Sequence, residues 1–374
     1  MKLALAEMRR NRGRFAAIIA ALVLIVFLVL VLNALADGLY YGATGAIRSS
    51  GADLYVFSKD GRRQLARSTI PASEAAKVAA VPGVAEVGEV GTLQGTGHGP
   101  TGTLDLALIG YTPGKPGGPS HATSGRLPRP DEPLAAAADV SLKDKSIRIG
   151  DEITFSGSSQ PLTIVGFTSD SRYELQPTLW TTIDTWRTVR NEARPEFQGK
   201  QDDIQALAVK LSKGASPTQT AAAIDAALGG GTETVSRATA VLSLPGVKQQ
   251  RSTFNQIIYT TFIVAAIVIA LFFALITLEK RTQLAILKAI GASSRYLASG
   301  ILVQSVLICL VGLGIGILLS RVLALLLPSS VPVTFRAATA VTIAVATIVT
   351  GALGAAFSFR RVTRIDPASA LGGA

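Results

Sequence analysis

Few side chains in this 374-residue chain could hold a metal ion or perform nucleophilic catalysis. Its two histidines, His98 and His121, each stand alone in a stretch rich in Gly and Pro, and the single cysteine, Cys309, lies inside an apolar run. The sequences GxxxxGK[ST], HExxH and GxSxG are absent, so the chain carries no phosphate-binding loop, zinc-protease motif or nucleophile elbow of its own. We therefore expect a protein that is not an enzyme and has neither a metal site nor a resident cofactor.

Four long apolar runs dominate the sequence instead. A membrane-spanning helix needs about 20 mostly apolar residues, and the runs 15–35, 257–278, 297–320 and 337–359 meet that length without an Asp, Glu, Lys or Arg. A signal peptide is the alternative for the first run, but its apolar core exceeds the roughly 7–15 residues of such a peptide. We predict four spans, and either alternative sends the segment 37–253 across the membrane.

The excess positive charge flanks these runs. The formal charge is +11, yet segment 37–253 holds 22 Lys and Arg against 22 Asp and Glu. The excess therefore lies at 1–14, 279–296, 321–336 and the tail. Basic residues beside spans favour the cytoplasmic side, so we expect both termini in the cytoplasm and the large segment outside. This distribution argues against nucleic-acid binding, which a basic chain would otherwise suggest.

The expected fold is an α-helical membrane protein with four transmembrane helices and an α+β extracytoplasmic domain between the first and second. Residues 1–36 would form a cytoplasmic amphipathic helix and the first span, 37–253 the outer domain, and 254–374 the other spans, a cytoplasmic helix and the tail. Predicted strands are 53–57, 84–90, 103–111, 153–155, 162–167 and 204–211, and predicted helices are 71–81 and 217–228. Stretches 92–100 and 112–125 have the composition of mobile loops, and the second is a candidate joint between two subdomains.

The third run carries polar and small residues that suit contact between helices. Gln304 and Cys309 are interpreted as packing or hydrogen-bonding groups, and Gly312, Gly314 and Gly316 would allow backbones to approach closely.

A short amphipathic helix is predicted between the second and third runs, at about 282–290. Apolar residues recur there at helical spacing, and Gly291 suits a helix stop. Either an interfacial helix or a docking element for a cytosolic partner fits this pattern. The residues concerned are Thr282, Gln283, Leu284, Ile286, Leu287, Lys288, Ile290 and Gly291.

At these residues the chain resembles the MacB/FtsX-type permeases of ABC transporters. The resemblance lies in the run LAILKAIGASSRYL, the tail RRVTRIDPASALGGA, the strands IGDEITF and LTIVGF, and the layout of one span, a large outer domain and three spans. Within that family the start MKLALAEMRRNRGRF, NALADGL and LKAIGASSRYLASGILVQ are most similar to the haem-exporting HrtB group and its DevC-like relatives.

The resemblance implies a homodimer in a bacterial plasma membrane, in contact with lipids and with two copies of a cytosolic ABC ATPase that binds ATP-Mg. Such permeases work by mechanotransmission: closure of the ATPases moves the outer domain, and no substrate need cross a central pore. Haem is the expected substrate. Export of another amphipathic molecule, such as a lipid, peptide or drug, and an FtsX-like signalling scaffold stay open as alternatives.

A haem site would need an axial ligand and polar or basic groups for the two propionates. The only methionines are Met1 and Met8, both expected in the cytoplasm, so tyrosine is the favoured ligand type. We single out Tyr173 as ligand beside Arg172 and Glu174, although packing at a subdomain junction is the alternative for Tyr173. Tyr40, Tyr41 and Tyr259 are further candidates, with membrane-interface anchoring as their alternative.

Overall fold

The computed structural model describes residues 12–197, 201–279, 286, 290–291, 293–328 and 331–362. The chain divides into two compact units. One, the helical unit, comprises Met1–Gly38 and Arg251–Ala374, and the other, the sheet unit, comprises Leu39–Gln250. Helices α2 (Arg12–Arg48) and α7 (Val247–Glu279) are each unbroken where the chain passes from one unit into the other.

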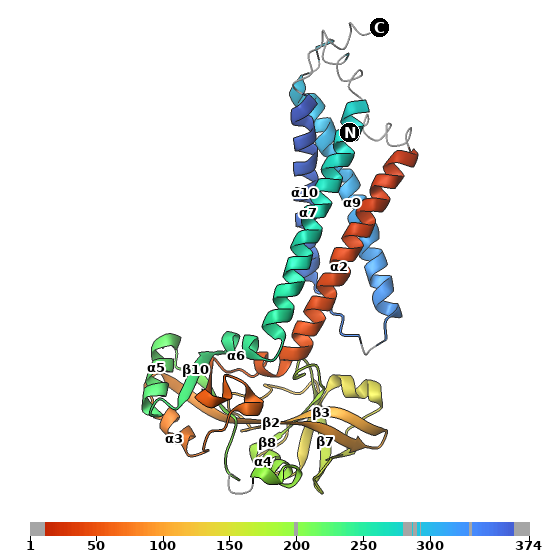
Figure 1. Cartoon of the computed structure of the whole chain (residues 1–374). Helices are drawn as coiled ribbons and strands as arrows, with labels where there is room; N and C mark the ends of the chain where they lie inside the picture. The colour runs from red at the N-terminus through yellow and green to blue at the C-terminus, as the bar shows by residue number, and fades with distance from the viewer. Residues whose placement is uncertain are drawn as a thin grey trace. The chain divides into compact units, whose positions relative to one another are not determined.

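One mixed sheet organises the sheet unit (Figure 1), in the order β10-β1-β9-β2-β3-β8-β5-β7-β4, with β6 paired to β2 and β7. The strands are β1 (Leu54–Ser58), β2 (Val84–Gly99), β3 (Gly102–Tyr111), β4 (Ser124–Gly125), β5 (Ala135–Asp139), β6 (Glu152–Phe155), β7 (Pro161–Thr168), β8 (Thr178–Thr182), β9 (Ala206–Leu211) and β10 (Thr232–Ser236). The helices are α3 (Glu74–Ala79), α4 (Ile183–Ala193), α5 (Pro217–Ala227) and α6 (Arg237–Ser243), with 3₁₀ turns η1 (Lys59–Gly61), η2 (Leu65–Arg67), η3 (Val140–Lys145) and η4 (Pro195–Phe197).

Part of this sheet closes on itself. Following the pairings from β2 through β3, β8, β5, β7 and β6 leads back to β2. Side chains alternate across it: Leu106 and Leu108 of β3 pack into one hydrophobic cluster, whereas Ala107 and Ile109 pack into the other. This two-residue period is the reason that one continuous sheet can support a core on each of its faces.

Five of the six predicted strands are confirmed within about two residues, and the sixth, 84–90, extends to Gly99 as β2. The prediction of a mobile loop at 92–100 is therefore wrong. Strand β2 runs through this stretch and forms a hairpin with β3. Gly97 in this stretch reflects crowding rather than mobility, because a Cβ atom there would lie 2.7 Å from Leu106 and 2.9 Å from Ile153. Stretch 112–125 does not join two subdomains either, since both of its flanks enter the same sheet.

Helix α4 packs on the sheet through one large side chain. Trp186 lies over Gly91 and Gly110, which are direct partners across β2 and β3. A Cβ atom at Gly91 would come within 2.4 Å of the indole, and one at Gly110 within 2.3 Å of Trp186 Cβ. The glycine pair therefore creates the space that the indole fills.

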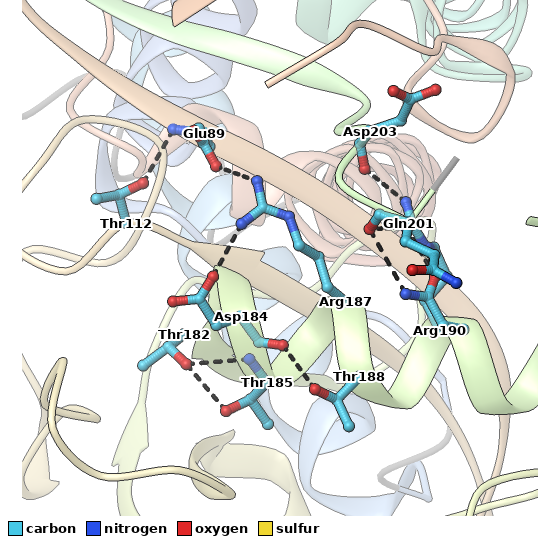
Figure 2. A network of polar contacts seen from close by, with 11 residues as sticks. Glu89, Thr112, Thr182, Asp184, Thr185, Arg187, Thr188, Arg190, Gln201 and Asp203 are labelled. Carbon is cyan, nitrogen blue, oxygen red and sulfur yellow. Dashed lines mark hydrogen bonds and ion pairs between the residues drawn. The ribbon is translucent and has the colours of Figure 1, made fainter. Parts of the chain in front are cut away.

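Two arginines hold α4 in place, and Figure 2 shows their contacts. Arg187 donates to Glu89 of β2 at 2.6 Å and to Asp184 at 2.8 Å. Arg190, only 2% exposed, donates to the backbone carbonyls of Asp203 at 2.6 Å and Gln201 at 2.8 Å. Burial lowers the pKa of Arg190 from its usual value, and these carbonyl acceptors compensate the buried charge.

The helical unit contains α2 up to Gly38 and α7 from Arg251 onward. It also contains α9 (Ser294–Leu326) and α10 (Ala337–Val362). Four helices among the described residues are long and apolar enough to cross a membrane: Phe15–Arg48, Val247–Phe272, Leu302–Leu326 and Ala337–Gly354. They share a core that includes Leu22 and Val26 of α2, Ile269 of α7, Ile308 of α9 and Ile343 of α10.

Small residues bring these helices together, as the sequence predicts. Gly312 and Gly316 of α9 face Leu22 and Val26 of α2 at distances that leave no room for a Cβ atom. At Gly314, by contrast, no atom of the described chain lies within 4 Å of a Cβ position, so its predicted packing role has no partner within this chain and stays a prediction. Ser305 donates to the Gly351 carbonyl at 2.9 Å, and Cys309 packs against Gly351. Close backbone approach thus joins α9 to α2 and to α10.

Replacing Gly110 by Ala should destabilise the sheet unit, because the new methyl group would displace Trp186 from the sheet. Overpacking of this kind costs about 1–3 kcal/mol. The measurement is thermal unfolding of the full chain in detergent, followed by circular dichroism. Gly231→Ala is the matched control, since a Cβ atom there meets open space. Equal melting temperatures for the two variants would contradict this account of α4 packing.

Candidate functional site

The last turns of α2 are bound by the loop 169–177, which connects β7 to β8. Three backbone hydrogen bonds join them: Ala46 N–H donates to Arg172 O at 3.0 Å, Glu174 N–H to Ala43 O at 3.0 Å, and Leu175 N–H to Gly42 O at 3.1 Å. Both partners belong to the sheet unit. Backbone contacts of this type fix the position of the helix along its axis as well as its distance from the loop.

Glycine makes this approach possible. A Cβ atom at Gly45 would lie 2.7 Å from the Asp170 carbonyl oxygen, a backbone atom that a side-chain rotation cannot move away. At Gly42 the nearest atom would be the Cδ2 of Leu175 at 3.1 Å, the end of a flexible side chain. Gly45 is therefore the stricter requirement of the two.

Charge and aromatic contacts reinforce this contact between the last turns of α2 and loop 169–177, which we call the junction. Arg48, at the end of α2, forms an ion pair with Asp170. Its guanidinium also lies over the Tyr41 ring, 4.3 Å from the centroid, and Tyr41 meets Tyr40 edge-on with centroids 5.3 Å apart. A cation between a carboxylate and an aromatic face gains from both.

A buried carboxylate connects the loop to the sheet. Asp139, at the end of β5, accepts hydrogen bonds from Ser171 Oγ at 2.6 Å and from Ser141 N–H at 3.0 Å, and lies 3.6 Å from Arg172 Nε. Thr178 of β8 donates to the Ser171 carbonyl at 2.9 Å. The loop that holds α2 is thereby anchored to β5 and β8.

Tyr173 belongs to loop 169–177, but its side chain packs into the core of the sheet unit, and the residue is 1% exposed. It belongs to the same cluster as Tyr55, Tyr111 and Trp180. Burial, together with the negative charge of Glu174 and a hydrogen bond to that side chain, raises the pKa of Tyr173 well above its usual value. The phenol is thus protonated at neutral pH. A buried tyrosine among aromatic neighbours is what the packing alternative for Tyr173 predicts.

The other predicted substrate residues are divided between the units. Tyr40, Tyr41, Arg172 and Glu174 join Tyr173 at the junction, where Glu174 also accepts from Gln94 at 3.0 Å. Tyr259 lies on α7 in the helical unit and is 67% exposed. In the described part of the chain, no group of three or more His, Cys, Asp or Glu side chains could hold a metal ion.

Most of the predicted docking helix lies outside the described residues, namely Thr282, Gln283, Leu284, Leu287 and Lys288. Of the rest, Ile290 N–H donates to Ile286 O at 3.0 Å, and Gly291 has φ +102°. A helical hydrogen bond followed by a glycine at positive φ is the geometry expected of a helix end.

The helical unit holds α2 as well, at a separate set of residues. Thr334 N–H donates to Ala34 O at 2.9 Å, and Thr339 Oγ1 donates to Asp37 at 2.8 Å. A Cβ atom at Gly38 would lie 1.9 Å from the Pro332 carbonyl oxygen. The segment 331–339 thus requires glycine at 38 in the way that loop 169–177 requires it at 45.

Comparison with known families identifies the family to which this chain belongs. Residues 15–227 match the family model of the MacB-like periplasmic core domain, and residues 255–367 match that of the FtsX-like permease C-terminal region. The chain belongs to the MacB/FtsX family of ABC transporter permeases. It is accordingly a plasma-membrane protein with a large extracytoplasmic domain, the sheet unit. At the level of the family, such subunits are not enzymes themselves and work with a partner ATPase subunit.

Similar proteins extend over the whole chain. One from Staphylococcus haemolyticus (strain JCSC1435), which bears the name hemin transport system permease protein HrtB, is 23% identical over 380 residues and covers 100% of this chain and 99% of its own. An uncharacterized ABC transporter permease from Mycobacterium tuberculosis (strain H37Rv) is 28% identical over 377 residues, with 99% of each chain covered.

Solved structures give weaker matches to the sheet unit. The periplasmic region of MacB from Actinobacillus actinomycetemcomitans has a TM-score of 0.39 and 16% identity over 52% of this chain and 92% of its own. The extracellular domain of the transporter YknZ from Gram-positive bacteria has a TM-score of 0.37 and 13% identity over 49% of this chain and 98% of its own.

Sequence reasoning singled out the loop at Arg172–Glu174 but missed most of what binds it. Arg48, Asp170 and Asp139 carry no local motif, because their partners lie far away along the chain. One available signal was Gly42 and Gly45 in an otherwise helical pattern, since helix-interior glycine costs stability unless packing requires it.

Replacing Gly45 by Ala should open the junction between α2 and the loop, because the added methyl group collides with the Asp170 backbone. We expect the amides of Ala46, Glu174 and Leu175 to exchange with deuterium roughly tenfold faster, as a local loss of about 1.4 kcal/mol implies. Mass spectrometry of the full chain in detergent measures this. Gly42→Ala, which meets only the end of the Leu175 side chain, is the control, and equal exchange in both variants would contradict the junction.

Proposed function

We propose that this chain is the permease subunit of an ATP-driven exporter that works by mechanotransmission, as a homodimer with two ATPase subunits, and that its substrate is haem. The observation that carries the proposal is α2. It is a single helix of 37 residues, about 55 Å long, and each unit holds it through contacts that exclude even one methyl group. A rigid element fixed in this way is suited to carry a displacement between the units.

The composition of the four apolar runs favours an energy source outside this chain. None of the four apolar runs contains an Asp, Glu, Lys or Arg, whereas transporters driven by ion gradients use ionisable groups within the membrane. The motifs for ATP binding are also absent from this chain. Energy from a separate ATPase is consistent with both facts.

Haem is proposed on two grounds. The first is the name of the S. haemolyticus relative, which covers the whole chain at 23% identity. The second is the concentration of tyrosine and arginine at the junction, where Tyr40, Tyr41 and Arg172 are partly exposed. Tyr41 or Tyr259 would meet haem in the structure as it stands, whereas Tyr173 would ligate iron only after loop 169–177 opens.

Leu284→Asp combined with Leu287→Asp should abolish association with the ATPase, because two charges would replace the apolar face of the proposed coupling helix. Co-purification from membranes measures association. Leu242→Asp, an exposed leucine of α6 in the sheet unit, should leave it unchanged. Normal association of the double variant would show that the coupling helix is wrongly assigned.

Titrating haem into the purified complex with its ATPase should give a saturable Soret shift and stimulated ATP hydrolysis. Loss of an axial ligand should weaken the apparent affinity by about tenfold or more, so Tyr41→Phe, Tyr173→Phe and Tyr259→Phe are compared.

A full shift in Tyr173→Phe, with an unchanged melting temperature, would assign Tyr173 to packing alone. If the unmodified complex shows neither a shift nor stimulation, haem is not the substrate, and another amphipathic molecule or a signalling role would take its place.

A further inference from the structure

An open cleft of about 440 Å³ lies in the sheet unit, and none of its lining residues belongs to α2 or to loop 169–177. It is formed by η3, the residues that follow it, and the adjoining strands β4 and β7. Its lining consists of Ser124, Lys143, Ser146, Ile147, Arg148, Ile149 and Phe167. The volume is within the range of about 300–1,000 Å³ typical of small-molecule sites.

Two cations line this cleft without a carboxylate partner among the described residues. Lys143 Nζ donates to Ser124 Oγ at 2.9 Å and lies 4.6 Å from the centroid of the Phe167 ring, two contacts that favour a position over the cleft. Within the described chain, no hydrogen bond or ion pair is recorded for the Arg148 guanidinium. The nearby Asp151 carboxylate accepts from the Arg148 backbone N–H at 2.7 Å instead. Two positive charges therefore remain available at one concave surface.

The rest of the lining is apolar or carries hydroxyl groups. Ile149 is 51% exposed, although isoleucine is usually buried. Beside it, Ile147 and Phe167 belong to the buried core and form the floor, and the Ser124 and Ser146 hydroxyls add hydrogen-bonding groups. The cleft thus combines two positive charges with an apolar surface, a combination that selects for amphipathic anions.

We propose that this cleft binds a small amphipathic anion, with its carboxylate, sulfonate or phosphate held by Lys143 and Arg148 and its apolar body against Ile147 and Ile149. The inference does not rest on haem export or on the coupling helix. The cleft also adjoins the anchor of α2, because η3 begins directly after Asp139 and Phe167 precedes Thr168, which hydrogen-bonds to Ser171 at 3.0 Å.

The test uses the full chain in phosphatidylcholine nanodiscs and 6-fluoro-2-naphthoate as the probe, followed by ¹⁹F NMR line width. We expect saturable binding above that of empty nanodiscs. The double variant Lys143→Glu and Arg148→Glu should weaken it at least tenfold, whereas Lys213→Glu with Lys248→Glu, the same charge change at exposed sites elsewhere in the sheet unit, should not. The neutral 6-fluoro-2-naphthamide should bind at least tenfold more weakly than the acid.

A second arm identifies the natural source of the anion. If nanodiscs with phosphatidylglycerol compete with the probe, the cleft takes an anionic lipid headgroup; if they do not, it takes a soluble anion, and both results support the site. Equal binding of naphthoate to the chain and to the Lys143→Glu, Arg148→Glu variant, equal binding of the amide, or no binding above empty nanodiscs would overturn the proposal. Circular dichroism of the variant confirms that its fold is retained.

Discussion

Close backbone approach to helix α2 is the constraint on which the rest of this structure depends. A helix normally presents side chains to its neighbours, which keeps other backbones at a distance. Here Gly38 and Gly45 remove the side chain at two points, and the carbonyl oxygens of Pro332 and Asp170 occupy the space. Contacts between backbones have little freedom to slide, so the same helix is fixed within the helical unit and within the sheet unit.

The sheet unit anchors the loop that contacts α2 at two places. The loop that holds α2 is tied by Ser171 to the buried Asp139 of β5 and by Thr178 to β8. Strands β5 and β8 belong to the closed circuit of strands, which has no free edge along which to separate. On another part of the sheet, α4 is held by Trp186 and two arginines. Polar groups buried with their partners add rigidity and specificity at such places, even where their net contribution to stability is small.

Different interactions stabilise packing in the helical unit and in the sheet unit. In the helical unit, small residues such as Gly312, Gly316 and Gly351 allow tight packing where the hydrophobic effect gives no drive between helices. In the sheet unit, large aromatic and aliphatic side chains are removed from water on both faces of one sheet. Helices α2 and α7 belong to both environments, and the mechanotransmission that we propose would depend on their continuity.

The sequence by itself determined the four spans, the concentration of positive charge beside them, the family and most strands, because length, hydropathy and period-two alternation are local properties. It also indicated the loop containing Tyr173. Only the tertiary structure decided that Tyr173 is buried, that Arg48 meets Asp170, and that stretch 92–100 belongs to a strand in which Gly97 leaves space for neighbouring side chains. It also decided the strand β5, whose run of alanines has no strong strand propensity of its own. Those outcomes depend on contacts with residues distant along the chain, and a local sequence pattern does not indicate which distant residue will make the contact.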